Sequence, residues 1–164
     1  MRPHAAVASA LQAFSGAALA HSAPQSFVTF EFREHSVHAL LLVPESEYAA
    51  ATAEKPGVDT LAPYLLRHVS AQAPAGKPWT IDIQGVRNTS YLEHRYLAAD
   101  VVLTPPVGTS AQSFTFGDDA VTHEVRNHLI VVVARSAGES RLLGTLQYPA
   151  RQLTVEWPAV KPAR

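Results

Sequence analysis

The histidines of this 164-residue chain are its main candidates for chemistry, because there are eight of them and no cysteine. Without thiolates, imidazole nitrogens are the side-chain ligands that suit a borderline transition metal such as Ni(II) or Cu(II). His123 and His128 lie five residues apart in the segment THEVRNH. On a regular strand this spacing points them to opposite faces, so a shared metal ion requires a bulge between them. The simpler interpretation is one inward histidine bonded to the backbone and one histidine facing solvent.

Residues 1–20 are typical of a secretory signal peptide, which would make His21 the first residue of the mature chain. They have a basic start at Arg2, an alanine-rich apolar run and a small-x-small end, ALA. The free α-amine and the imidazole of His21 predict chelation of Cu(II), with a further histidine completing a three-nitrogen site. Two alternatives stay open: an alanine-rich helix of a cytosolic protein, and a flexible chain end at His21. The run is too short and too mild for a transmembrane helix.

Catalytic motifs are missing from the sequence. It contains no G-x-S-x-G elbow, Walker loop, G-x-G-x-x-G fingerprint or H-E-x-x-H pair. The adjacent carboxylates of Asp118 and Asp119 are more simply explained as a turn. The formal charge of −1, from 13 basic and 14 acidic residues, provides no electrostatic footprint for nucleic acid. We therefore predict neither an enzyme nor a nucleic-acid-binding protein.

The His123/His128 segment is expected to lie on the central strand of a β-rich domain. From Ala120 to Arg135 the odd positions are mostly apolar, and from Leu129 the even positions are apolar too, so that end should be covered on both sides. Alternation elsewhere predicts about eight strands with short turns, which favours an antiparallel β-sandwich of Greek-key or Ig-like type over a parallel α/β sheet. The other expected strands are 26–32, 37–43, 79–84, 91–103, 114–116, 142–148 and 153–157, with turns at 33–36, 85–90 and 137–139.

A two-helix insertion at about 45–71 interrupts this pattern. Its first part, ESEYAAATA, is rich in helix formers, and the following KPG breaks it. Asp59 is expected to cap a second helix that runs from Thr60 to about Ala71. The predicted organisation is therefore a signal peptide at 1–20, one domain at 21–157 and a tail or linker at 158–164.

Several segments resemble the extracytoplasmic N-terminal domain of HupE/UreJ-type hydrogenase/urease accessory membrane proteins: HSAP at 21–24, LLLVPESEYAAA, VVLTPP, and THEVRNHLIVVVAR followed by LLGTLQY. The likeness covers most of residues 21–157. Its most specific element, T-H-x-x-x-x-H, carries over to His123 and His128. The resemblance implies a secreted domain that precedes membrane helices and has an accessory role linked to nickel or a related metal. This chain departs from that pattern, since nothing after Trp157 could span a bilayer. It is expected to be the soluble part of a longer protein or a free-standing periplasmic relative.

We therefore expect a periplasmic or extracellular accessory or sensing domain of a metal-handling membrane system. In this interpretation it binds Ni or Cu weakly through His21, His123 and His128, and its partner is a membrane protein or membrane subunit. The alternative is a non-catalytic protein–protein interaction domain that binds no metal. Because imidazole ligands must be deprotonated, metal affinity would fall sharply below about pH 6.5, whereas docking would show no such dependence.

Overall fold

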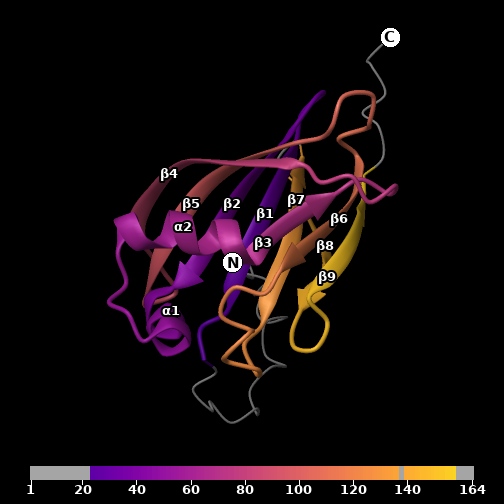
Figure 1. Ribbon diagram of the computed structural model, residues 1–164. Coiled ribbons are helices and arrows are strands. Elements are labelled where there is room, and N and C mark those ends of the chain that lie inside the picture. The colour runs from indigo at the N-terminus through magenta and orange to yellow at the C-terminus, as the bar shows by residue number, and fades with distance from the viewer. Residues whose placement is uncertain (1–22, 137–138, 158–164) are drawn as a thin grey trace, which may run out of the picture.

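The computed structural model describes residues 23–136 and 139–157, which form two β-sheets and two helices (Figure 1). The predicted signal peptide, His21 and the tail at 158–164 lie outside the described residues. In chain order the elements are β1 (Ser26–Phe32), β2 (Val37–Pro44), α1 (Glu45–Thr52), α2 (Val58–His68), β3 (Val69–Gln72), β4 (Thr80–Tyr91), β5 (His94–Thr104), β6 (Ser113–Asp118), β7 (Ile130–Ser136), β8 (Glu139–Leu146) and β9 (Gln152–Glu156).

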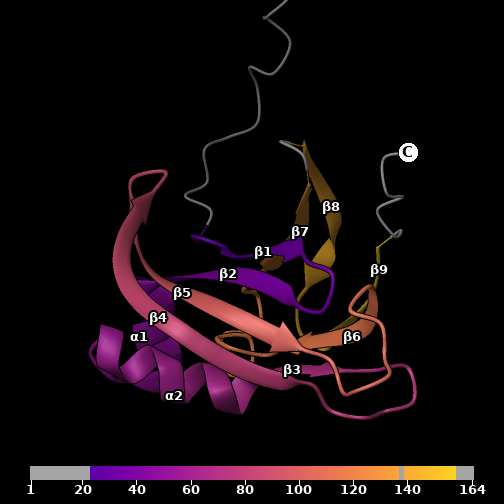
Figure 2. The ribbon, with the colours of Figure 1, turned by 90° about the horizontal axis from the view of Figure 1, so that it is seen from above.

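The two sheets form a mainly β sandwich, which confirms the predicted fold class. The larger sheet has the order β4-β5-β2-β1-β7-β8, and the smaller has the order β3-β6-β9. Helices α1 and α2 lie on the same side of the larger sheet as the smaller sheet and cover its β4–β5 half (Figure 2). Neighbouring strands are antiparallel except β1 and β7, which run parallel with Ser26 opposite Ile130. Parallel neighbouring strands need a long connection between them, and the intervening elements β2 to β6 provide one.

The β1–β2 hairpin follows the predicted alternation closely. Its two strands join through the predicted turn at 33–36, and they pair from Phe27 opposite Leu42 to Phe32 opposite Val37. Alternate side chains of both strands point into the sandwich, because successive residues of a strand face opposite sides of the sheet. The buried inward set consists of Val28, Phe30, Val37, Ala39, Leu41 and Val43.

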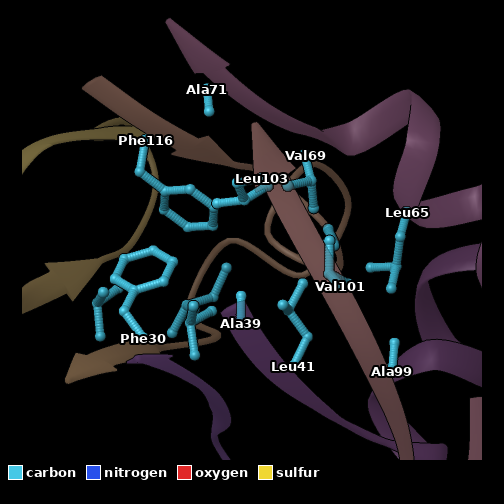
Figure 3. Packing of buried hydrophobic residues seen from close by; sticks show 14 of the residues in the cluster. Phe30, Ala39, Leu41, Leu65, Val69, Ala71, Ala99, Val101, Leu103 and Phe116 are labelled. Atoms are coloured by element: carbon cyan, nitrogen blue, oxygen red, sulfur yellow. The ribbon is translucent and has the colours of Figure 1, made fainter. Parts of the chain in front are cut away.

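Aromatic rings join the two sheets at the centre of the core. The ring of Phe30 on β1 meets the rings of Phe114 and Phe116 on β6 edge to face, at centroid distances of 5.6 and 5.0 Å. Such edge-to-face pairs are favourable beyond the area that they bury. Leu65 of α2 extends the same core toward Val101 of β5 (Figure 3). One continuous apolar core therefore holds both sheets and the helical insertion together.

The helical insertion is present, with different bounds for its second helix. Helix α2 begins at Val58 after Gly57 and ends at His68, so Asp59 lies inside the first turn and is not the cap. A carboxylate in the first turn still stabilises the helix, since it faces the positive end of the helix dipole. The apolar stripe that suggested a longer helix continues as strand β3, where Val69 and Ala71 stay buried.

The predicted turn at 85–90 is wrong, because β4 continues through it to Tyr91. Strand β4 pairs with β5 along this length, with a bulge between Ile83 and Gly85. It is an edge strand, where turn-like polar residues are tolerated because one side of the strand faces no neighbour. The chain reverses instead at Leu92 and Glu93, whose φ angles are 46° and 66°.

The single strand predicted from Ala120 to Arg135 is also wrong. Only Ile130–Ser136 is a strand, and it lies between β1 and β8 with inward residues that are fully buried. Residues 120–129 form successive turns. Val121 has a φ of 66°, which no β-strand accommodates. His123 and His128 therefore lie on a loop before the strand.

The strand predicted at 142–148 is shifted toward the N-terminus, and β8 is Glu139–Leu146. The predicted turn at 137–139 lies mostly outside the described residues. A register shift opposite Val132 and Val133 breaks the expected alternation. As a result Leu142 is 62% exposed, whereas Leu146 is buried.

Candidate functional site

Ionisable groups with shifted pKa values gather at the connection between β6 and β7, residues 119–129, which we call the β6–β7 loop. Asp118 immediately precedes this loop, His128 lies in it, and the Tyr64 hydroxyl accepts a hydrogen bond from it. Burial raises the pKa of Tyr64 to about 12. Shifted pKa values and strained backbone both concentrate at functional sites. The β6–β7 loop is therefore the first candidate site in the described part of the chain.

Val121 is held in its left-handed conformation from two directions. Its side chain is fully buried, and its backbone N–H donates to the Tyr64 hydroxyl at 2.8 Å. Its carbonyl oxygen accepts from the backbone N–H groups of Glu124 and Val125. A β-branched residue in this region is strained and persists only where its surroundings impose the conformation. Helix α2 therefore helps to set the shape of the loop.

Replacing Tyr64 by Phe is expected to lower the free energy of unfolding by about 1–3 kcal/mol, because the buried N–H of Val121 loses its acceptor. Urea denaturation followed by circular dichroism measures this change. Tyr48→Phe is the matched control: its ring lies 5.0 Å from that of Tyr64, and the change leaves the bond to Val121 intact. Equal stabilities of the two variants would show that the bond contributes little.

Asp118 places a buried carboxyl group at the start of the loop. Its side chain is 4% exposed, and Oδ1 accepts from the backbone N–H of Ala120 at 2.9 Å. Burial raises the pKa of Asp118 to about 7, and the neighbouring charge of Asp119 acts in the same direction. The hydrogen bond from Ala120 opposes both effects. Asp118 thus shapes the turn, but its ionised form destabilises the folded state because the charge is buried.

His68 and His123 form a stacked imidazole pair beside Asp119. Their ring centroids are 4.3 Å apart, and their planes differ by 22°. His68 is the last residue of α2, and its Nδ1 lies 2.7 Å from Asp119 Oδ1. The Nδ1 of His123 lies 3.1 Å from the Asp119 carbonyl oxygen. One residue of the loop thus holds both rings.

These contacts determine which ring nitrogen of each neutral histidine carries the proton. A carbonyl oxygen and an ionised carboxylate can only accept hydrogen bonds, so both Nδ1 atoms must donate. In the neutral rings of His68 and His123 the Nε2 atoms then keep their lone pairs. This tautomer is the one found in metal-ligating histidines that a carboxylate or carbonyl orients.

Arg151 completes the arrangement by occupying the other oxygen of Asp119. Its Nη1 donates to Asp119 Oδ2 at 2.8 Å, and the two side chains are 41% and 24% exposed. A shallow surface depression at this point is lined by Arg67, His68, Asp119 and Arg151, among others. His68 of the imidazole pair therefore lies at the edge of a depression that is open to solvent.

His128 has a different and fully internal environment. Its Nε2 lies 2.8 Å from the hydroxyl oxygen of Ser26 on β1, and Glu47 Oε2 of α1 is 3.5 Å from its Nδ1. The imidazole side chain is 1% exposed. Burial lowers the pKa of His128 to about 4, and burial also raises the pKa of Glu47. The order serine, histidine, carboxylate resembles a hydrolytic triad, but Ser26 is only 4% exposed, so a substrate has no access to it.

The predicted metal ligands are therefore not brought together as a set within the described chain. His128 contacts Ser26 and Glu47, whereas His123 contacts His68 and Asp119. Among residues 23–136 and 139–157, no three His, Asp or Glu side chains are arranged to hold a metal ion. His21 lies outside these ranges, so its predicted role stays a prediction. The residues of the predicted site that are described do not fit one shared metal.

A second unusual feature is the tip of the β4–β5 hairpin, which lies at one end of the curved larger sheet (Figure 2). Leu92 is 71% exposed there although its φ is 46°, and Glu93 follows with a φ of 66°. Two-residue turns with two positive φ angles favour Asn-Gly and similar pairs. The ring of Tyr91 is fixed beneath the tip by that of Phe27, at a centroid distance of 5.3 Å and an interplanar angle of 79°.

A surface hollow of about 400 Å³ lies on the outer face of the larger sheet. It is lined by side chains of five strands, including Glu31, His38, Asp100 and Arg135. Arg87 forms an ion pair with Asp100 in this area. The β6–β7 loop and the hairpin tip are the stronger candidates, because both contain strained non-glycine backbone.

Sequence reasoning did not identify His68, Asp119 as an orienting residue, or Leu92. His68 is 51 positions from Asp119, so only the tertiary fold brings them together. Asp119 was interpreted as part of a turn, which is correct for the backbone but omits its side chain. Leu92 was placed inside a strand. The polar segment 85–90 has a more turn-like composition than the true turn at Leu92 and Glu93.

Neither the protein-family models nor the curated proteins include a match to this chain. In the described part of the chain, neither helix has the length and apolar character required to cross a bilayer.

Proposed function

We propose that this domain is an extracytoplasmic, non-catalytic accessory module that docks on a partner membrane protein. The HupE/UreJ resemblance suggests that the partner belongs to a metal-handling system, and residues 1–20 suggest the location. The single observation that carries the docking proposal is the exposed Leu92 at a strained hairpin tip.

Folding alone does not explain Leu92. A left-handed conformation costs a non-glycine residue about 1–2 kcal/mol, and Leu92 and Glu93 both adopt it. An exposed leucine recovers none of this cost by burial in the domain itself. The turn requires positive φ angles but not a leucine, so an exposed leucine at this strained position is a reason to infer a functional role there.

A pocket in a protein suits this tip better than a lipid surface does. Burying one leucine contributes about 1.5–3 kcal/mol, which is too little to anchor a domain in a membrane. The carboxylate of Glu93 at the same turn resists entry into lipid and favours a cationic group beside the pocket. The fixed backbone of the turn lowers the entropic cost of docking.

The double variant Leu92→Asn/Glu93→Gly is expected to be more stable than the native domain by about 1–2 kcal/mol, because both residues then suit the turn. Urea denaturation measures this gain. Val107→Asn, at an exposed apolar residue of another loop, is the control and should change little. A less stable double variant would show that the turn is not strained and would remove the argument for docking.

Docking itself is tested by a photo-reactive amino acid at position 92 in cells that make the protein naturally. We expect one crosslinked product that contains an integral membrane protein, and no such product from position 107. The product should also disappear when excess protein without the photo-reactive group competes. Crosslinks to lipid alone, or equal products from both positions, would contradict the proposal.

A further inference from the structure

We propose that His68 and His123 supply two imidazole ligands of a transition-metal site and that Asp119 positions both rings. This inference does not depend on the hairpin tip or on its partner. It replaces His128 with His68 as the second imidazole, because His128 is enclosed between Ser26 and Glu47.

The hydrogen bonds of Asp119 prepare the two rings for a metal. Its carboxylate holds Nδ1 of His68 and its carbonyl holds Nδ1 of His123, so both Nε2 lone pairs remain for a ligand. Outer-shell partners of this kind fix the tautomer and orientation of ligating histidines. Arg151 binds the second carboxylate oxygen at 2.8 Å, which keeps Asp119 in the positioning role.

The stacked geometry requires one adjustment before a metal can bind to both rings. A metal ion lies in the plane of each imidazole that binds it, at about 2 Å from the nitrogen, so two face-to-face rings cannot both reach one ion unless at least one of them rotates. A rotation of the side chains achieves this, and His68, at 18% exposure, borders the open depression. Water molecules would supply the remaining ligands.

The ligand class follows from the donor atoms. Two imidazoles without a thiolate favour borderline divalent ions, and the general affinity order places Cu(II) above Ni(II). His35, His38 and His94 are the exposed histidines of the described strands and turns, and they offer natural controls. We therefore expect Cu(II) to bind at the imidazole pair more tightly than Ni(II).

Calorimetric titration of the full chain with copper chloride and with nickel chloride tests the site. His68→Gln and His123→Gln are each expected to weaken binding at least tenfold, and His38→Gln should leave it unchanged. Asp119→Asn should weaken binding about tenfold while the stoichiometry stays the same. The proposal is overturned if both histidine variants bind like the native chain, or if His21→Gln alone abolishes binding.

Proton NMR of the unaltered chain supplies a readout that does not depend on how the variants fold. Substoichiometric Cu(II) should broaden the imidazole resonances of His68 and His123 selectively, because a paramagnetic ion relaxes the nuclei nearest to it. The resonances of His128 should stay sharp. Broadening of His38 or His94 in preference to the pair would overturn the assignment. Neither experiment involves the partner, so a negative result here leaves the docking proposal standing.

Discussion

Replacing Asp118 by Asn is expected to make the domain more stable at pH 8, by up to about 4 kcal/mol. The pKa of the buried carboxyl is about 7 in the folded protein, against 3.8 for an ordinary aspartate. A shift of about three units corresponds to about 1.4 kcal/mol per unit. The amide keeps an oxygen that can accept from the Ala120 N–H, so the turn is retained while the buried charge is removed.

The same variant should reveal a pH dependence that the native protein conceals. Between about pH 4 and 7 the folded state binds more protons at Asp118 than the unfolded state, so stability falls as pH rises. His128 acts in the opposite direction: its folded pKa is about 4 against 6.5, so stability rises between about pH 4 and 6.5. The two slopes offset each other across this window. In Asp118→Asn the slope of Asp118 is removed and that of His128 dominates, so stability is lost as the pH falls from 6.5 to 4.

Urea denaturation at half-unit steps from pH 4 to pH 8 measures both effects. His128→Gln should show the opposite profile, with stability that falls as the pH rises from 4 to 7. Burial also raises the pKa of Glu47, so this residue makes stability fall as the pH rises, as Asp118 does. Its contribution is present in the native protein and in both variants, and it therefore largely cancels when their profiles are compared. Asp100→Asn, at an exposed aspartate, should parallel the native protein. An Asp118→Asn profile that coincides with the native one would refute the buried, titrating carboxyl.

The parts of the fold that the sequence predicts well are those in which one rule dominates. The β1–β2 hairpin is an example, because its strands have one face in the core and their alternation is undisturbed. The prediction fails where local and tertiary effects disagree. The polar segment 85–90 has turn-like composition, yet its backbone pairs with β5, which the sequence does not reveal. The true turn at Leu92 lacks the expected turn residues.

The candidate site was predictable only in outline. The segment THEVRNH does lie in the β6–β7 loop that contains His123 and His128, but its period of two arises in a series of turns. The left-handed Val121 separates the β6 strand from the imidazoles and has no sequence signature of its own. His128 meets Ser26 across 102 positions, and His68 meets Asp119 across 51. Contacts at such separations depend on the packing of the whole sandwich, which local patterns do not encode.

Phe30→Ala is expected to lower the free energy of unfolding by about 3–5 kcal/mol, since it removes a fully buried ring and leaves a cavity. The lost ring contacts both Phe114 and Phe116, so the change loosens the contact between the two sheets. Phe27→Ala is the matched control on the other face of β1. That ring is only partly buried and contacts Tyr91 near the hairpin, so a smaller loss is expected. Guanidinium denaturation compares the two variants. Equal losses would mean that the outer face of β1 contributes as much to stability as the core between the sheets, contrary to the burial pattern of the strand.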